Sequence, residues 1–128
     1  MSSFPTPRRI LRETLSATPD NLLSLKNEVM HMLLMAEGAK DKNPAVIQSL
    51  ALEAAMLEEK LGAARLEAGA KEDAATNFIS AASCWVAAGK KTDALRALDR
   101  ARELTEKDAM LRWIKNYTKQ VEAMRAVT

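Results

Sequence analysis

Glycine, proline, cysteine, histidine and aromatic residues are all scarce in this chain of 128 residues. It has four glycines and four prolines, and aromatic residues make up 4% of it. Domains rich in β-sheet need many turns, so this scarcity favours helices. Because Cys84 is the only cysteine, no intramolecular disulfide is possible and a cysteine-based zinc site is unsupported. The sequence therefore predicts an all-α protein without a metal or cofactor.

Long hydrophobic runs are also missing. The apolar stretches are far shorter than the roughly 18 residues that a transmembrane helix needs, and the N-terminus lacks the apolar core of a secretory signal. We therefore expect no membrane contact and a cytoplasmic location. Hydrophobic residues make up 48% and charged residues 28%, which is typical of a folded soluble protein, and the length suits one domain.

The net charge is +2, but acidic and basic residues are unevenly distributed along the chain. Residues 20–88 hold six basic and ten acidic residues, whereas residues 89–128 hold ten basic and six acidic ones. This asymmetry predicts two surfaces of different charge. Two solvated faces are one explanation, and a partner contact or head-to-tail self-association is the other.

Start and stop signals divide the chain into an N-terminal arm and a helical domain over residues 18–128. The arm, residues 1–17, is either mobile or forms a short helix over residues 8–16. Cap residues followed by proline begin the first two helices of the domain, at Thr18-Pro19 and Asn43-Pro44. The expected helices span residues 18–38, 43–68, 71–88, 92–105 and 108–125.

The boundary between the last two helices rests on residues 105–108, which offer capping chemistry and no apolar side chain. One unbroken helix over residues 92–125 is the alternative, because no glycine or proline enforces a stop there.

The first helix has an unusually broad apolar stripe. Its members recur at helical spacing: Leu22, Leu25, Val29, Met32 and Leu33, widened by Leu23, Met30, Leu34 and Met35. Such a width predicts burial on more than one side.

A small–large–small triplet occurs twice, each time five residues after a turn glycine. The first copy is Ala74, Phe78 and Ala81, and twenty residues later come Ala94, Leu98 and Ala101. Small residues let two helices cross closely, and the large residue between them fills the groove.

Residues 55–88 resemble one tetratricopeptide repeat, because Leu61-Gly62 precedes the first triplet at that family's spacing. The second triplet follows after 20 residues instead of the family's 34, which is similar to looser tetratricopeptide-like domains such as the SNAP adaptor proteins. The chain departs from the family pattern at Glu58, Arg65 and Val86. The resemblance implies an antiparallel stack of helical hairpins with about five helices, and a role in binding another protein.

Residues able to support catalysis or metal binding are few and scattered. His31 is the only histidine, and its methionine neighbours point in other directions on a helix, so we expect a packed or surface role. Cys84 is expected to be a buried structural thiol. Adjacent Glu58 and Glu59 diverge on a helix and are expected on a solvated face. Without a glycine-rich phosphate loop or a nucleophile set, we expect no enzymatic activity.

The basic C-terminal quarter contains an aromatic pair. Trp113 and Tyr117 share one helix face, and rings flanked by cations can stack on bases. Met110, Ile114 and Val121 continue the same apolar side, so core or partner contact is favoured over nucleic acid.

The sequence thus predicts a non-catalytic interaction module, an adaptor, chaperone or scaffold that binds a peptide or helix of another protein in the groove of a helical stack. A homo-oligomerising domain and nucleic-acid binding are the alternatives. The predicted partner-binding residues are Arg65, Asn77, Ser80, Lys91 and Arg96 in the groove, and Trp113 and Tyr117 on the last helix.

Overall fold

Five α-helices account for most of residues 19–125, the part of the chain that this computed structural model describes. They are α2 (Pro19–Glu37), α3 (Pro44–Glu67), α4 (Lys71–Ala87), α5 (Lys91–Leu104) and α6 (Asp108–Ala123). The all-α class is confirmed for these residues, and each expected helix end lies within two residues of the observed one. The N-terminal arm and its short helix, expected over residues 8–16, lie outside the described residues.

Local capping chemistry sets the helix ends. At the start of α3, the Asn43 side chain accepts hydrogen bonds from the backbone N–H groups of Ala45 and Val46. Gly69 and Gly89 follow α3 and α4 with φ values of 82° and 75°, a left-handed conformation that favours glycine. The chain therefore turns at the two glycines, as their positions in the sequence indicate.

The break between α5 and α6 is confirmed, so the alternative of one helix over residues 92–125 is wrong. Thr105 ends α5 in an extended conformation. Its hydroxyl donates to Glu72 Oε2 at 2.8 Å, and the backbone N–H of Glu106 donates to Glu72 Oε1 at 2.9 Å. A carboxylate from α4 thus holds the chain where no glycine or proline stops the helix.

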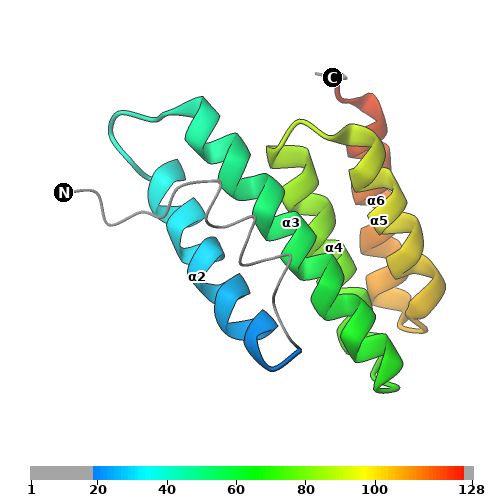
Figure 1. Ribbon diagram of the computed structural model, residues 1–128. Helices are drawn as coiled ribbons and strands as arrows, with labels where there is room; N and C mark the ends of the chain where they lie inside the picture. Colours follow the sequence, from blue (N-terminus) through cyan, green and yellow to red (C-terminus); the bar gives the residue numbers. More distant parts are fainter. Residues whose placement is uncertain (1–18, 126–128) are drawn as a thin grey trace.

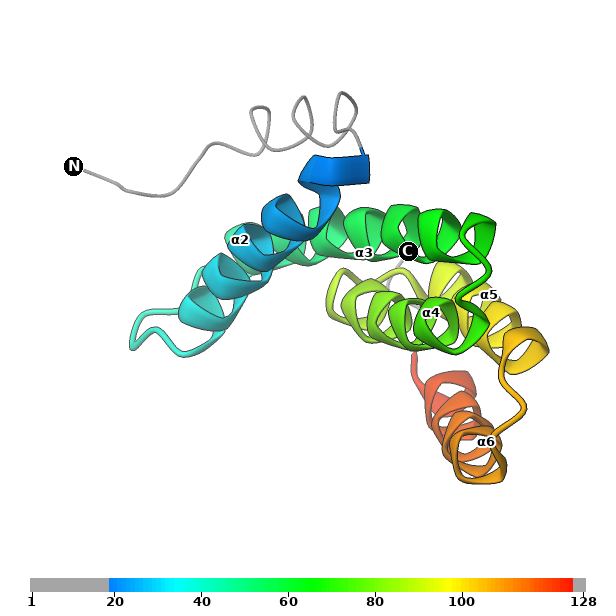
Figure 2. The same ribbon diagram turned by 90° about the horizontal axis from the view of Figure 1, so that it is seen from below.

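The helices form a stack in which each packs mainly on its neighbours in the sequence (Figure 1). Seen from below, α2 and α6 lie at opposite ends, with the other three helices between them (Figure 2). One core cluster joins α2, α3 and the end of α4, and a second joins α4, α5 and α6. The two terminal helices α2 and α6 therefore each have one packed side and one open side.

The two triplets are buried between α4 and α5, with Ala74, Ala81, Leu98 and their counterparts almost inaccessible. Gly62 on α3 lies against the ring of Phe78, since a Cβ atom placed at Gly62 would come within 2.9 Å of Phe78 Cε2. The guanidinium carbon of Arg100 lies 5.2 Å from the centroid of the same ring. Residues that sequence spacing singled out thus control how closely α3 and α4 approach.

The broad apolar stripe of α2 is buried on one side only, so the expectation of burial on more sides is wrong. Leu22, Val29, Met32 and Leu33 belong to the core. Three of the four widening residues remain exposed, with exposed fractions of 45% for Leu23, 64% for Leu34 and 53% for Met35, whereas Met30 is partly buried against the core. The reason is positional, because α2 packs mainly on α3 and ends the described stack.

Candidate protein-binding surface

The predicted groove residues Arg65 and Asn77 are engaged in an internal polar network. Arg65 Nη1 on α3 donates to Asn77 Oδ1 on α4 at 2.8 Å, and Asn77 Nδ2 donates to Glu58 Oε1 at 3.0 Å. Asn77 and Glu58 are both buried. Buried polar groups need such partners, so this network joins α3 to α4. The expectation of a solvated Glu58 is wrong, because α4 covers it.

Glu59, the neighbour of Glu58, also has a partner on α4. Its Oε2 accepts a hydrogen bond from Trp85 Nε1. The two adjacent carboxylates diverge, as expected, yet both are used in helix packing. They do not form a paired acid–base site.

Cys84 is confirmed as a buried thiol, with its Sγ atom 3.9 Å from Met30 Sδ on α2. Burial, reinforced by the negative charges of Glu58 and Glu37, raises the pKa of Cys84 to about 12. The thiolate form required of a nucleophile is therefore strongly disfavoured at neutral pH.

Lys91, the first residue of α5, lies beside the C-terminal end of α6. Its ammonium group donates to the backbone carbonyls of Glu122 at 2.8 Å and Met124 at 2.9 Å. A cation at a helix C-terminus is favourable because the last carbonyls are negative and lack helix partners. Lys91 thus ties α5 to α6. Of the other two predicted groove residues, Ser80 is half-buried on α4, and Arg96 is exposed beside Asp93.

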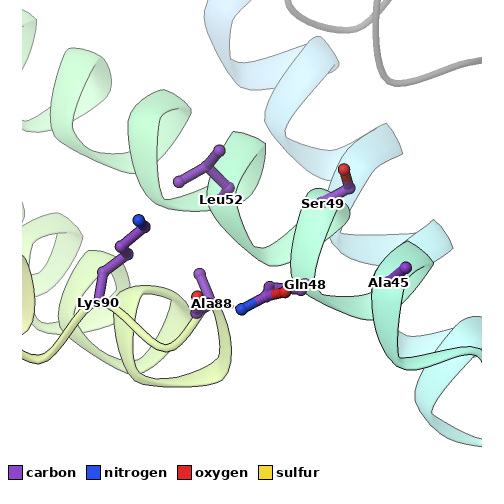
Figure 3. A pocket seen from close by; sticks show the side chains of 6 residues that line it. All are labelled: Ala45, Gln48, Ser49, Leu52, Ala88 and Lys90. Carbon is purple, nitrogen blue, oxygen red and sulfur yellow. Dashed lines mark hydrogen bonds between the residues drawn. The ribbon is translucent and has the colours of Figure 1, made fainter. Parts of the chain in front are cut away.

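A shallow hollow of about 300 Å³ lies between the start of α3 and the end of α4 (Figure 3). Gln48 Nε2 donates to the carbonyl of Ala88 at 3.0 Å beside it. The side chains that line it are Ala45, Gln48, Ser49, Leu52, Ala88 and Lys90. This hollow is mixed in polarity, and its described lining does not include the predicted groove residues.

The two remaining predicted partner-binding residues, Trp113 and Tyr117, lie on the last helix, α6. The rings of Trp113 and Tyr117 stack with centroids 5.0 Å apart and an interplanar angle of 26°. Trp113 is 46% exposed, and Tyr117 is half-buried. α6 buries only Ile114 and Val121, which lie seven residues apart on one line of the helix. Most of its circumference is therefore open.

Two different surfaces flank the buried line of α6. The first, which we name the aromatic flank, consists of Met110, Trp113, Tyr117 and Met124. Met124 is exposed, and a small hollow of about 110 Å³ separates it from Val86 of α4. The aromatic flank therefore continues onto the neighbouring helix.

On the other side of Ile114 a groove of about 420 Å³ separates α6 from the end of α5. We name this the basic flank, because three cations contribute to it. Its lining consists of Arg102, Leu111, Lys115, Thr118, Lys119 and Glu122.

Over residues 19–125, no group of three or more His, Cys, Asp or Glu side chains is arranged to hold a metal ion. The histidine singled out in the sequence, His31, is exposed on α2. None of the described helices is both long and apolar enough to span a bilayer.

No family model matches the chain, and no curated protein or solved structure shows significant similarity to it.

Proposed function

We propose that this chain is a non-catalytic protein–protein interaction module, and that the aromatic flank of α6 binds a helix or peptide of the partner. The observation that carries the proposal is a tryptophan that is 46% exposed and stacked on a tyrosine, on a helix with one packed side. Tryptophan and tyrosine are the residues most enriched among the energetic anchors of protein interfaces.

The stacked pair is suited to binding because its geometry exists before the partner arrives. Trp113 and Tyr117 hold each other in place, so less side-chain entropy is lost on binding. Met110 and Met124 extend the flank with flexible side chains that adapt to different shapes. A preformed aromatic centre with adaptable edges favours an apolar helix face or peptide as the ligand.

The separation of the two flanks favours protein over nucleic acid. Base stacking needs cations beside the exposed rings. Lys115 and Lys119, however, line the basic flank on the other side of Ile114. At the hollow beside Met124 the lining cations are Arg125 and Lys91, whose ammonium group is bonded to the end of α6. A nucleic acid would have to pass around α6 to use both the rings and the two lysines.

The tetratricopeptide-like arrangement is part of the same proposal. Its support is the close contact of Gly62 with Phe78 and the burial of both triplets. A stack of this kind is a rigid scaffold for display of a binding surface, which suits an adaptor, chaperone or scaffold. Because Arg65 and Asn77 join α3 to α4, the proposed binding surface lies on α6 and not in the groove first expected.

The test is quantitative capture of partners from native lysate by the full chain, followed by mass spectrometry. Trp113→Ala should reduce recovery of a stoichiometric protein about tenfold or more, since loss of a central interface tryptophan costs about 2 kcal/mol or more. Arg112→Ala is the matched control, because Arg112 is exposed next to Trp113 but points away from the flank. It should leave recovery unchanged.

Equal recovery by Trp113→Ala and the unaltered chain would overturn the assignment to this flank. Binding of labelled RNA or DNA that weakens steeply with salt, and is lost in Lys115→Ala and Lys119→Ala, would instead support the nucleic-acid alternative.

A further inference from the structure

The groove at the basic flank is long enough to hold a segment of another chain. On α6 its lining begins at Leu111 and ends at Glu122, and Arg102 lines it from α5. Because each helix residue adds about 1.5 Å, Leu111 and Glu122 lie about 16 Å apart along the axis, which is about three helical turns. The groove therefore extends along most of α6.

Two lysines in the middle of this groove have no partner in the part of the chain that the structure describes. Lys115 and Lys119 are exposed, and no hydrogen bond or ion pair of a described residue involves either ammonium group. Residues four apart lie on the same side of a helix, where two like charges destabilise it slightly. An anionic ligand between the two lysines would remove this repulsion.

The other charged groups at the groove leave its centre positive. Arg102 is bonded to Asp99, with 3.0 Å between Nη2 and Oδ1. Glu122 is the one carboxylate of the lining, and it lies at the C-terminal end of the groove. The cations without a carboxylate beside them are thus Lys115 and Lys119. Their charge is available to a ligand.

Charge complementarity identifies the occupant, and we propose that the basic flank binds an acidic segment of another protein, with two carboxylates about one helical turn apart facing Lys115 and Lys119. Opposite charges meet across protein interfaces. Leu111 and Thr118 line the same groove, so the segment also carries an apolar side chain next to its carboxylates. A short amphipathic helix with acidic residues meets both requirements.

The chain itself is poorly suited to supply this segment. The carboxylates that give residues 20–88 their acidic excess are largely used inside the fold, because four of them are buried or bonded to neighbouring helices: Glu53, Glu58, Glu59 and Glu72. Residues 1–17 contain three arginines and one glutamate. A twofold contact between two basic flanks would bring the lysines against each other. The acidic segment is therefore assigned to a different protein.

A nucleic acid fits the groove less well than an acidic protein segment. It carries a phosphate at every nucleotide, whereas both ends of the groove are acidic. Glu122 lies at one end, and the exposed Asp108 lies about one turn before Leu111 at the other. These carboxylates would repel a continuous polyanion, but they leave room for a segment with only two or three acidic residues.

The first experiment measures the affinity of the full chain for synthetic peptides by fluorescence anisotropy. The probes are helical peptides of about 15 residues. Each has one row of leucines and, beside this row, a pair of Glu, Gln or Lys residues one helical turn apart. The Glu peptide should bind at least about tenfold more tightly than the Gln peptide in about 50 mM salt, and the ratio should shrink in about 300 mM salt, which screens charges.

The second experiment exchanges the charges. Lys115→Glu combined with Lys119→Glu should reverse the preference, so that the Lys peptide binds more tightly than the Glu peptide. Both lysines are exposed, so the core is left intact. Arg112→Glu is the matched control, because it makes the same change of charge on the same helix but outside the lining. It should weaken binding of the Glu peptide by less than about threefold.

Equal binding of the Glu and Gln peptides would overturn the proposal. Equal losses from Arg112→Glu and from the double lysine variant would overturn it too, because they would show an effect of overall charge. A labelled single-stranded oligonucleotide that displaces the Glu peptide and binds more tightly would overturn it in favour of nucleic acid.

The aromatic flank provides the control for the position of the peptide. Trp113→Ala should leave the affinity for the Glu peptide unchanged, whereas binding that is lost in this variant would overturn the proposal by placing the peptide on the aromatic flank. Failure of this inference is therefore distinguishable from failure of the proposed function, which depends on Trp113.

Discussion

Glu72 at the start of α4 fixes Thr105 at the end of α5, with 2.8 Å between Glu72 Oε2 and the Thr105 hydroxyl. The other carboxylate oxygen accepts the backbone N–H of Glu106. These two bonds connect positions more than thirty residues apart. They hold the turn that lets α6 fold back onto α5.

The first prediction is that Glu72→Ala destabilises the chain at neutral pH and loosens α6. Two accepted hydrogen bonds are lost, so the midpoint of thermal unfolding should fall by about 2–4 °C. Asp73→Ala is the matched control, because Asp73 is also acidic and in the first turn of α4. If both variants lose the same stability, the effect comes from the helix dipole alone.

The second prediction concerns how the stability difference between the unaltered chain and Glu72→Ala depends on pH. The hydrogen bond from the Glu106 backbone, then the one from Thr105, lowers the pKa of Glu72 below its ordinary value. A lowered pKa in the folded state means that the stabilisation is present above the ordinary pKa of a glutamate. It is lost as pH falls through the folded-state pKa. Urea unfolding at pH 7, 5 and 3 should show the gap between the unaltered chain and Glu72→Ala closing at the lowest pH. A gap of constant size would contradict a role for the carboxylate charge.

The helix ends were predictable from the sequence because their causes are local. Asn43 and Gly69 act on backbone groups within a few residues. The break at Thr105 was anticipated from local capping residues, but Glu72, which secures it, could not be identified. Glu72 and Thr105 are close in the structure but 33 residues apart in the sequence, and no periodicity connects them.

The surfaces were harder to predict than the helices, for a physical reason. Apolar spacing shows which residues share a helix side but not whether another helix covers it. Leu34 therefore counted as core, although it is exposed. Conversely, Glu58 counted as solvated, although Asn77 covers it. Trp113 and Tyr117 were identified correctly as sharing a side, because that depends only on their spacing of four.

The third prediction is that Gly62→Ala destabilises the chain by about 1 kcal/mol. The added Cβ would meet the Phe78 ring at 2.9 Å, so the ring, which is buried and lies beneath the Arg100 guanidinium, must shift. Overpacking of this kind costs about 1–3 kcal/mol, from which the better helix propensity of alanine, about 1 kcal/mol, is subtracted.

Gly38→Ala is the control for this substitution, because a Cβ there lies no closer than 3.4 Å to the nearest atom. It should be neutral or slightly stabilising. Phe78→Leu should cost less in the Gly62→Ala background than in the unaltered chain, because the smaller side chain relieves the crowding. Additive effects in chemical denaturation would show that the two residues are not coupled.

The fourth prediction is that Asn77→Ala destabilises the chain by about 2–3 kcal/mol. The substitution removes the group that bridges Arg65 and Glu58 and leaves a buried carboxylate without its amide donor. Ser80→Ala is the control on the same helix, since Ser80 is half-buried outside this network, and it should change the unfolding free energy by less than about 0.5 kcal/mol. A similar small effect for Asn77→Ala would mean that water replaces the amide at no cost.

The fifth prediction is that Cys84 is unreactive while the chain is folded. Its pKa of about 12, against an ordinary value of 9.0, corresponds to about a thousandfold less thiolate at pH 8. Modification by an aromatic disulfide reagent should therefore be at least about a thousandfold slower in buffer than in 6 M guanidinium chloride.

The Cys84 thiol on α4 contacts Met30 of α2. The rate of modification should therefore rise in low concentrations of urea that open this contact before global unfolding. Leu22→Ala, which weakens the packing of α2 in the same core cluster, should raise the rate in plain buffer, whereas Ile114→Ala in the second cluster should raise it less. Immediate and complete modification of the native chain would show that α2 does not protect the thiol and that the core cluster of α2, α3 and α4 opens freely.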